Sequence, residues 1–310
     1  MSRLVLAELR RVAARRLVRL AVLLAVIGAV GGGILAFATS GSVSESTYQQ
    51  RVRDAHTRQQ AQEVEIQTCL RRNGIDREQE QKISDEVAQQ CFPDSQISAK
   101  DPRFHRTRLK GVLQGVSGVL AIVGWALGAS LVGAEFASRS MTTLLTYEPR
   151  RARVFAAKCT AVLVGTAVLA FGALVLVALA MAPSLIAHGA PLRSQDPSVA
   201  ALAGIVGRGT ALATLAAGMG FAIATIGRNT AAALGVGFAY IVILENILGG
   251  SVERWRRWLL LGNVIVFVSG NSNGGDVPGR TVTEAGVFLA AVAVTLLVAA
   301  VGVFQARDLA

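Results

Sequence analysis

The sequence predicts an all-α polytopic membrane protein with six transmembrane helices. Of its 310 residues, 52% are hydrophobic and only 16% are charged, and the mean hydropathy is positive. Soluble domains carry about 25% charged residues, so this composition favours a chain that lies largely in lipid. Long apolar runs alternate with polar segments, and the basic residues gather at the ends of those runs, as the positive-inside rule expects.

The net charge of +11 does not indicate a nucleic-acid-binding protein. The largest polar segment, residues 40–109, carries 11 basic and 11 acidic residues and is therefore neutral. Residues 1–19 carry six arginines against Glu8 alone. Because the basic excess is confined to the ends of the spans, it indicates membrane topology and contact with anionic lipid.

Residues 1–39 are predicted to form an N-terminal amphipathic helix and the first span. Within residues 3–19, arginines recur along one stripe, which predicts a helix that lies in the inner membrane interface. The alternative is the charged front of a signal peptide, but the apolar run that follows, residues 20–38, has full length and no convincing cleavage site. At 1.5 Å per residue this run reaches about 28 Å, enough to cross the hydrocarbon core.

Residues 40–109 are predicted to form an extracytoplasmic helical domain. A first helix over residues 44–72 is rich in Gln, Glu and Arg, and Asn73 and Gly74 then provide a helix stop and a turn. A second helix is expected from residue 76 to about residue 90. The two helices make a helical hairpin inserted between the first and second spans.

The three cysteines are expected to differ in role. Cys69 and Cys91 flank the turn and second helix of the hairpin and face the oxidising side of the membrane, so a disulfide between them is predicted. Cys159 lies in the third span and is expected to be an inert packed thiol. A metal site is poorly supported, because the two histidines of the domain, His56 and His105, have no useful spacing.

Residues 110–310 are predicted to contain the other five spans, separated by short polar segments. These spans are expected at residues 110–132, 155–182, within 199–226, 230–249 and 284–304. Glycines predict close helix packing on the first and second spans. They are Gly28, Gly31, Gly32 and Gly33 on the first, and Gly111, Gly115, Gly118, Gly124 and Gly128 on the second.

A shorter apolar element precedes the last span. Within residues 251–270 the apolar run from Trp255 to Ser269 has only about 15 residues, too few to cross a bilayer, so a re-entrant or interfacial element is predicted. Tryptophans beside arginines suit the headgroup level there. The inner segments of this arrangement sum to 13 basic and four acidic residues, and both termini are therefore predicted to be cytoplasmic.

A polar loop, residues 134–158, separates the second and third spans. Its first part, from Glu135 to Leu145, is expected to be helical, and Pro149 ends that helix because proline lacks a backbone N–H and restricts the residue before it. The basic residues that follow are explained by topology alone. Topology does not explain Glu135 or the pair Thr142 and Thr143, and a contact with another protein is therefore predicted.

This loop resembles that of the membrane subunits of type-2 ABC export permeases. In that family an acidic residue follows the second span, then a Gly/Ser/Thr-Leu-Leu patch, a proline turn and basic residues that lead to a lysine. The matching positions are Glu135, residues 140–145, Pro149, residues 150–153 and Lys158. The patch here begins with serine where the family commonly has glycine. The re-entrant element is a second point of resemblance, whereas residues 40–109 are an insertion that the family pattern does not require.

The resemblance implies the transmembrane subunit of an ATP-driven exporter in a bacterial inner membrane. It implies two copies of a separate cytoplasmic ABC ATPase, which bind ATP and Mg²⁺, and a second membrane subunit, identical or homologous. No catalytic, cofactor or metal residue is predicted in this chain, which has no phosphate-binding loop motif. The residues expected to contact the ATPase are Glu135, Arg139, Thr142, Thr143, Leu144, Tyr147, Pro149, Arg150 and Arg151.

Two other classes fit the sequence less well. An intramembrane enzyme needs a nucleophile, a base or metal ligands that converge at membrane depth, but His56, His105 and His188 all lie in predicted outer segments and the spans contain no acidic pair. A secondary transporter usually has carboxylates within its spans to carry protons or ions. The ABC subunit is therefore the preferred hypothesis.

Two charges, Arg208 and Glu245, are predicted to lie inside or at the edge of the fourth and fifth spans. Counted from the turn at residues 227–229, Glu245 lies about 22 Å and Arg208 about 27 Å along its helix. Since the two helices are joined by a tight turn, we expect the charges to meet as an intramembrane ion pair in the outer leaflet. The alternative is that each snorkels separately to outer water.

Overall fold

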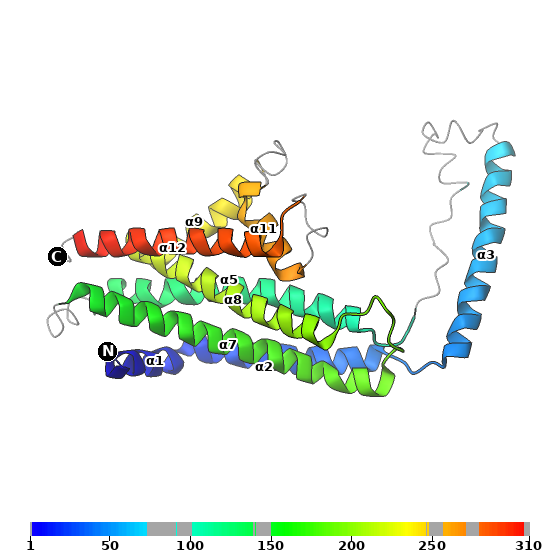
Figure 1. Cartoon of the computed structure of the whole chain (residues 1–310), viewed down its shortest axis with the longest axis horizontal. Coiled ribbons are helices and arrows are strands. Elements are labelled where there is room, and N and C mark those ends of the chain that lie inside the picture. Colours follow the sequence, from blue (N-terminus) through cyan, green and yellow to red (C-terminus); the bar gives the residue numbers. More distant parts are fainter. Residues whose placement is uncertain are drawn as a thin grey trace.

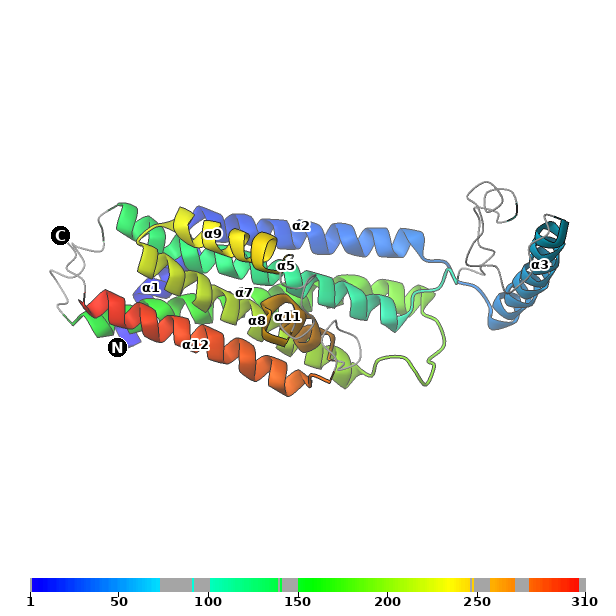
Figure 2. The ribbon, with the colours of Figure 1, turned by 90° about the horizontal axis from the view of Figure 1, so that it is seen from above.

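The computed structural model describes residues 2–72, 91, 101–138, 140, 150–245, 247, 257–270 and 279–306, and the regular elements in these residues are helices. Five of the described helices are long and apolar enough to cross a membrane, and they lie side by side along the long axis (Figures 1 and 2). They are α2 (Arg16–Thr39), α5 (Arg106–Ala137), α7 (Arg151–His188), α8 (Val199–Gly227) and α12 (Val282–Ala306). The prediction of an all-α, multi-pass membrane protein is confirmed.

The bundle has two distinct ends. Helix α1 (Ser2–Ala14) begins and α12 finishes at one end, which we call the termini end (Figure 1). Helix α3 (Glu45–Arg72) lies beyond the opposite end, which we call the α3 end. The predicted fifth span begins as α9 (Thr230–Ala239) and continues as a π-helix, η2 (Tyr240–Glu245). A ten-residue apolar helix, α11 (Leu260–Ser269), occupies the predicted re-entrant position, and the count of six spans remains a prediction.

Two predicted helix boundaries were wrong. A continuous amphipathic helix was expected over residues 3–19, but the backbone is extended at Arg15 (ψ 138°), so that α1 ends at Ala14 and α2 begins at Arg16. Helix α1 packs along the first part of α7, and its place in the membrane interface remains a prediction. Also, α7 continues through Pro183, where a loop was expected.

The end of α7 is held by a short backbone bridge to the start of α5. The N–H of Phe104 donates to His188 O at 2.8 Å, and the N–H of Ala190 donates to Phe104 O at 3.1 Å. These bonds anchor the last turn of α7, which explains why the helix continues after Pro183 although proline removes one hydrogen bond from it. Phe104 itself is buried, with 1% of its surface exposed.

Helices α5 and α8 pack backbone to backbone. Gly124 and Gly128 of α5 lie against the backbones of Ala213 and Ala217 of α8, where an added Cβ atom would collide with the carbonyl oxygens. The predicted packing face of the second span is therefore confirmed at these two glycines. Gly115, on the same helix, has open space beside it, as do Gly111 and Gly118. On the first span only Gly33 makes such a contact, with Ala180 of α7.

We predict that Gly128→Ala lowers stability, because the methyl group must push α5 away from α8. Overpacking of this kind costs about 1–3 kcal/mol. The matched control is Gly115→Ala, which should be neutral or slightly stabilising because alanine favours a helix more than glycine does. Thermal unfolding of the purified full chain measures both, and equal melting temperatures for the two variants would contradict the close α5–α8 contact.

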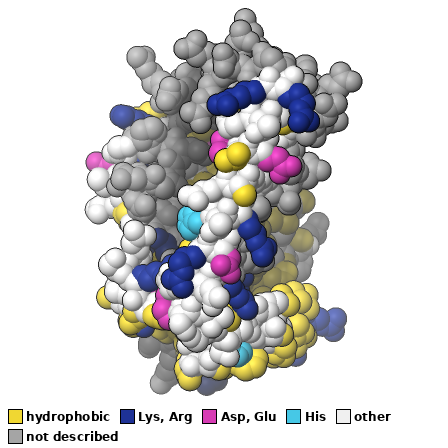
Figure 3. All heavy atoms as spheres, turned by 90° about the vertical axis from the view of Figure 1, so that its right-hand side faces the viewer, with side chains coloured by type: hydrophobic (Ala, Val, Ile, Leu, Met, Phe, Trp, Pro, Cys, Tyr) yellow, Lys and Arg dark blue, Asp and Glu magenta, His cyan; other side chains and the backbone are white. Residues whose placement is uncertain are grey.

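The predicted disulfide is confirmed. Cys69, near the end of α3, is bonded to Cys91 with an S–S distance of 2.01 Å. Helix α3 corresponds to the predicted first helix of the hairpin and lies away from the bundle (Figures 1 and 2). The turn at residues 73–74 and the predicted second helix, residues 76–90, lie outside the described residues. Figure 3 shows basic and acidic side chains interspersed over this end, in accord with the balanced charge of the segment.

A buried arginine joins α3 to the bundle. Arg103, just before α5, has a side chain that is only 3% exposed. Its guanidinium donates to both carboxylate oxygens of Asp101 at 2.8–2.9 Å and to Glu45 Oε2 at 2.6 Å, and it lies 4.4 Å from the centre of the Tyr48 ring. Glu45 and Tyr48 form the first turn of α3. Arg103 thus fixes the beginning of α3 to the beginning of α5.

The contacts of Asp101 in this junction shift its pKa. Burial would raise the pKa of Asp101, but hydrogen bonds from Arg103 and His105 outweigh it and lower the pKa to about 2. A carboxyl group whose pKa is depressed in the folded state contributes stability above its unfolded pKa. That contribution is lost as the pH falls from about 4 to about 2.

We predict that the stability difference between the wild type and Asp101→Asn depends on pH. The asparagine variant lacks the titrating carboxylate, so the wild type should be more stable by roughly 2 kcal/mol above about pH 5. This advantage should shrink between about pH 4 and pH 2. Thermal unfolding of both proteins across that range gives the comparison, and a constant difference would contradict the ion-pair origin of the effect.

Candidate functional site

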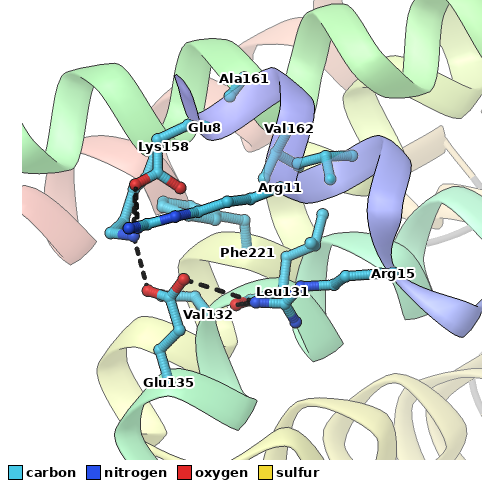
Figure 4. Close-up of a pocket in the computed structure, with 11 residues that line it drawn as sticks. Glu8, Arg11, Arg15, Leu131, Val132, Glu135, Lys158, Ala161, Val162 and Phe221 are labelled. Atoms are coloured by element: carbon cyan, nitrogen blue, oxygen red, sulfur yellow. Dashed lines mark hydrogen bonds and ion pairs between the residues drawn. The ribbon is translucent and has the colours of Figure 1, made fainter. Parts of the chain in front are cut away.

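A group of charged side chains lies at the termini end, where α1, α5 and α7 meet (Figure 4). Its members are Glu8, Arg11, Arg15, Glu135 and Lys158, which we call the Lys158 cluster. They come from α1, from the break between α1 and α2, from the last turn of α5 and from the second turn of α7. Of these residues, Glu135 was the one predicted to be functional.

Lys158 stands between two carboxylates. Its Nζ lies 2.7 Å from Glu135 Oε2 and 3.2 Å from Glu8 Oε1, and its side chain is only 6% exposed. The ammonium group therefore bridges an acid on α1 and an acid on α5, and Arg11 and Arg15 supply the further positive charge beside them. Because an unpaired buried charge is far more costly than an exposed one, Lys158 fixes the positions of both helices against α7.

Arg15 connects the cluster to the backbone of α5. Its guanidinium donates to Ser130 O at 3.2 Å and Leu131 O at 3.1 Å, and it lies 3.4 Å from Glu135 Oε1. A helix carbonyl has two lone pairs, so it can accept a side-chain hydrogen bond in addition to its bond within the helix. The extended backbone at Arg15 is what directs the side chain away from α2 and toward α5, so the unexpected break in the N-terminal helix belongs to this site.

The rest of the cluster is more open. Arg11 donates to Glu8 Oε1 at 3.0 Å, but its side chain is 61% exposed, so this pair contributes little. A small cavity of about 20 Å³ adjoins the charges and is lined also by Val12, Val132 and Phe221. A volume of this size holds about one water molecule. The cluster thus extends from buried Lys158 between the helices to exposed Arg11 at the termini end.

The Lys158 cluster leads directly into the predicted contact loop. Glu135 lies two residues before the end of α5, and the chain continues through Ser138, whose N–H donates to Ala134 O at 3.0 Å. At the other end of the loop Arg150 is exposed, and Arg151 Nη1 donates to Gln305 O of α12 at 3.4 Å. Six of the predicted contact residues lie outside the described residues. They are Arg139, Thr142, Thr143, Leu144, Tyr147 and Pro149.

The sequence contained a signal for the pairing that was not used. Glu8, Arg11 and Val12 follow the spacing i, i+3, i+4, which places an acid, a cation and an apolar residue on one face of a helix. A single acid among six arginines in residues 1–19 indicated a specific partner. Only the structure identifies that partner as Lys158, because Glu8 and Lys158 are 150 positions apart in the sequence.

The structure does not bring Arg208 and Glu245 together as the predicted ion pair. Glu245 Oε1 accepts a hydrogen bond from the N–H of Leu261 at 2.7 Å. The guanidinium of Arg208 lies against Gly270, and its buried Nε has no hydrogen-bond partner. The short helix α11 separates the two charges. In the described part of the chain, no group of three or more His, Cys, Asp or Glu side chains is placed to hold a metal ion.

We predict that Lys158→Met strongly destabilises the chain, because Glu8 and Glu135 then lose the buried cation that they share and keep only the more exposed Arg11 and Arg15. Breaking a buried pair on one side costs about 3–5 kcal/mol. Adding Glu8→Gln to Lys158→Met should recover part of the loss, since one buried carboxylate is then removed. Thermal unfolding of the full chain measures the series.

The matched control for this series is Arg11→Ala, which breaks an exposed pair with the same Glu8. It should cost less than about 1 kcal/mol. A Lys158→Met variant as stable as Arg11→Ala would show that the charges do not hold α1, α5 and α7 together. A double variant less stable than Lys158→Met alone would contradict the repulsion between the two acids.

Comparison with known proteins gives one clear result. The protein family described as ABC-2 family transporter protein matches residues 6–309, nearly the whole chain. The match includes most of α1, the Lys158 cluster, the polar segment that carries α3 and all five long helices. A search among curated proteins found no match.

Proposed function

This chain belongs to the ABC-2 family of transporter proteins, whose members are membrane components of ABC transporters, and we propose that it forms the translocation path of an ATP-driven exporter. ATP hydrolysis would come from a separate ABC ATPase, present in two copies, which binds ATP and Mg²⁺. A second membrane subunit, identical or homologous, would complete the path. This chain itself would carry no catalytic residue.

In this proposal the termini end is cytoplasmic, and the α3 end faces outward from a bacterial inner membrane. The disulfide between Cys69 and Cys91 supports the outer placement of α3, because disulfides persist in oxidising compartments. The arginines of α1 and of the loop after α5 support the inner placement of the other end. Helix α9 with η2 would be a span, so that the chain crosses the membrane six times.

In this orientation each part of the chain has a proposed location. Residues 1–39 hold α1 and the first span, residues 40–109 form the outer domain, and residues 110–310 carry the remaining spans. The ATPase would bind the loop 134–158, through Glu135 and Arg150 at its described edges and through the predicted residues between them. The re-entrant element, residues 251–270, would lie near the outer surface.

The observation that carries this proposal is the position of Glu135. It stands at the end of α5, where the loop begins, and is bonded to Lys158 of α7 and to Arg15 beside α1. A displacement of the loop by the ATPase would therefore act on three helices together through one set of charges. Helix α5 also packs tightly on α8, so the movement would reach the centre of the bundle.

We predict that the affinity-tagged full chain co-purifies with an ABC ATPase in a stoichiometric complex that hydrolyses ATP. Arg139→Glu should weaken retention of the ATPase about tenfold, equivalent to about 1.4 kcal/mol. Arg139 is a better target than Glu135, whose reversal would also disturb Lys158. Quantified co-purification from membranes, with ATP hydrolysis of the eluted complex, provides the measurement.

The matched control is Arg58→Glu, which reverses an exposed arginine on α3 at the opposite end of the molecule. It should leave ATPase retention unchanged. A purified chain without any ATPase, active on its own, would overturn the proposed function. Equal retention by Arg139→Glu and Arg58→Glu would overturn only the contact through the loop.

A further inference from the structure

The two charges that were expected to pair, Glu245 and Arg208, lie instead at opposite ends of α11. At the start of α11, Glu245 Oε1 accepts from the N–H of Leu261 at 2.7 Å, and Tyr240 Oη accepts from the N–H of Leu260 at 3.1 Å. The helix has Leu259 at its N-cap position, which offers no side-chain oxygen. The first turn of α11 is thus capped by side chains of η2 rather than by its own residue.

The π-helical conformation of η2 explains how both side chains reach α11. Tyr240 and Glu245 are five residues apart, and in an α-helix they would point about 140° away from each other. In a π-helix, hydrogen bonds run from residue i to i+5, so residues five apart lie one above the other. The local change of helix type therefore places a hydroxyl and a carboxylate on one face, toward the N–H groups of α11.

The opposite end of α11 meets a cation. Gly270 ends the helix with φ 68°, a conformation that favours glycine, and a Cβ atom there would also collide with Arg208 Nη2. Gln114 Nε2 of α5 donates to Ser269 O at 3.2 Å. The Nε of Arg208 is buried and has no hydrogen-bond partner, and the guanidinium lies beside Gly270, at the carbonyl end of α11.

The signs of these charges match the dipole of the helix. A helix carries partial positive charge at its first N–H groups and partial negative charge at its last carbonyls, so an acid favours the start and a cation favours the end. Helix α11 has only ten residues, and in lipid its end groups must be satisfied by protein. Tyr240 and Glu245 accept hydrogen bonds at the start of α11, Gln114 donates one at its end, and the cation of Arg208 lies beside that end.

We propose that Glu245 and Arg208 are positioning residues that hold α11 in one orientation by acting on its two ends. The body of α11 is apolar and packs on its neighbours through Val266 against Ala285, and through Val268 against Leu212 and Leu289. Apolar contacts alone leave the direction of a short helix weakly specified. The two charges specify it, because reversing α11 would bring its carbonyl end to Glu245 and its N–H end to Arg208.

Exchanging the two charges has opposite expected effects if Glu245 and Arg208 act on the ends of α11 and if they form a direct ion pair. In an ion pair, Glu245→Arg with Arg208→Glu restores the attraction. In the dipole arrangement the exchange places the wrong charge at both ends of α11, so the double variant must be at least as impaired as the two single variants combined. The exchange therefore separates the two interactions without requiring any transported substrate.

The experiment measures thiol labelling of Val266→Cys in the full chain, in membranes, with Cys159→Ala as background. Val266 is fully buried, so its thiol reacts only when α11 leaves its site. Glu245→Gln and Arg208→Gln should each raise the labelling rate on the order of tenfold, whereas Arg208→Lys, which keeps the cation, should stay near the wild-type rate. The charge exchange should raise the rate further.

The matched control is Val162→Cys, which is buried in α7 away from α11. Its labelling rate should stay constant in every variant. A charge exchange that returns Val266→Cys to the wild-type rate would overturn the proposal in favour of an ion pair. Unchanged labelling in both glutamine variants, or an equal rise at Val162→Cys, would also overturn it, because the charges would then have no specific effect on α11.

Discussion

The backbone contact between α5 and α8 is the constraint on which the other parts of the bundle depend. Gly124 and Gly128 allow it, and Gly133 extends it to Thr230 at the start of α9. The Trp125 ring projects from α5 against Gly237, so the position of α9 follows from that of α5. A shift of a few tenths of an ångström at these glycines would move elements at both ends of the molecule, because close-packed helices transmit displacement rather than absorb it.

The charges between helices, some buried and some partly exposed, are balanced in three different ways. Lys158 is shared between acids of two helices, and Arg103 is enclosed by two acids and an aromatic ring. Glu245 and Arg208 face the ends of a helix and need no charged partner. In each case the groups that balance the charge come from different helices. These charges therefore add to the close α5–α8 contact in fixing how the other helices are placed.

The spans were predictable because their signal is local. The fourth span was expected within residues 199–226 and is observed at residues 199–227. Both the length of an apolar run and the turn at Arg228 depend on residues that are consecutive in the sequence. The disulfide was predictable from two cysteines in one polar segment. Counting along helices also gave Glu245 and Arg208 similar heights, but it did not reveal that α11 lies between them. Lateral packing depends on residues far apart in sequence, and for the same reason the link between Glu8 and Lys158 was missed.

The Lys158 cluster also has a consequence for the order in which the chain is made. Glu8 and Lys158 are separated by 150 positions, and Arg15 and Glu135 by 120. At a synthesis rate of about 5–20 residues per second, α1 waits roughly 8–30 s for its partner on α7. During that interval Glu8 remains solvated near the membrane surface, and α1 docks only after the third long helix has been inserted. The N-terminal helix can therefore complete its contacts only when about half of the chain has been made.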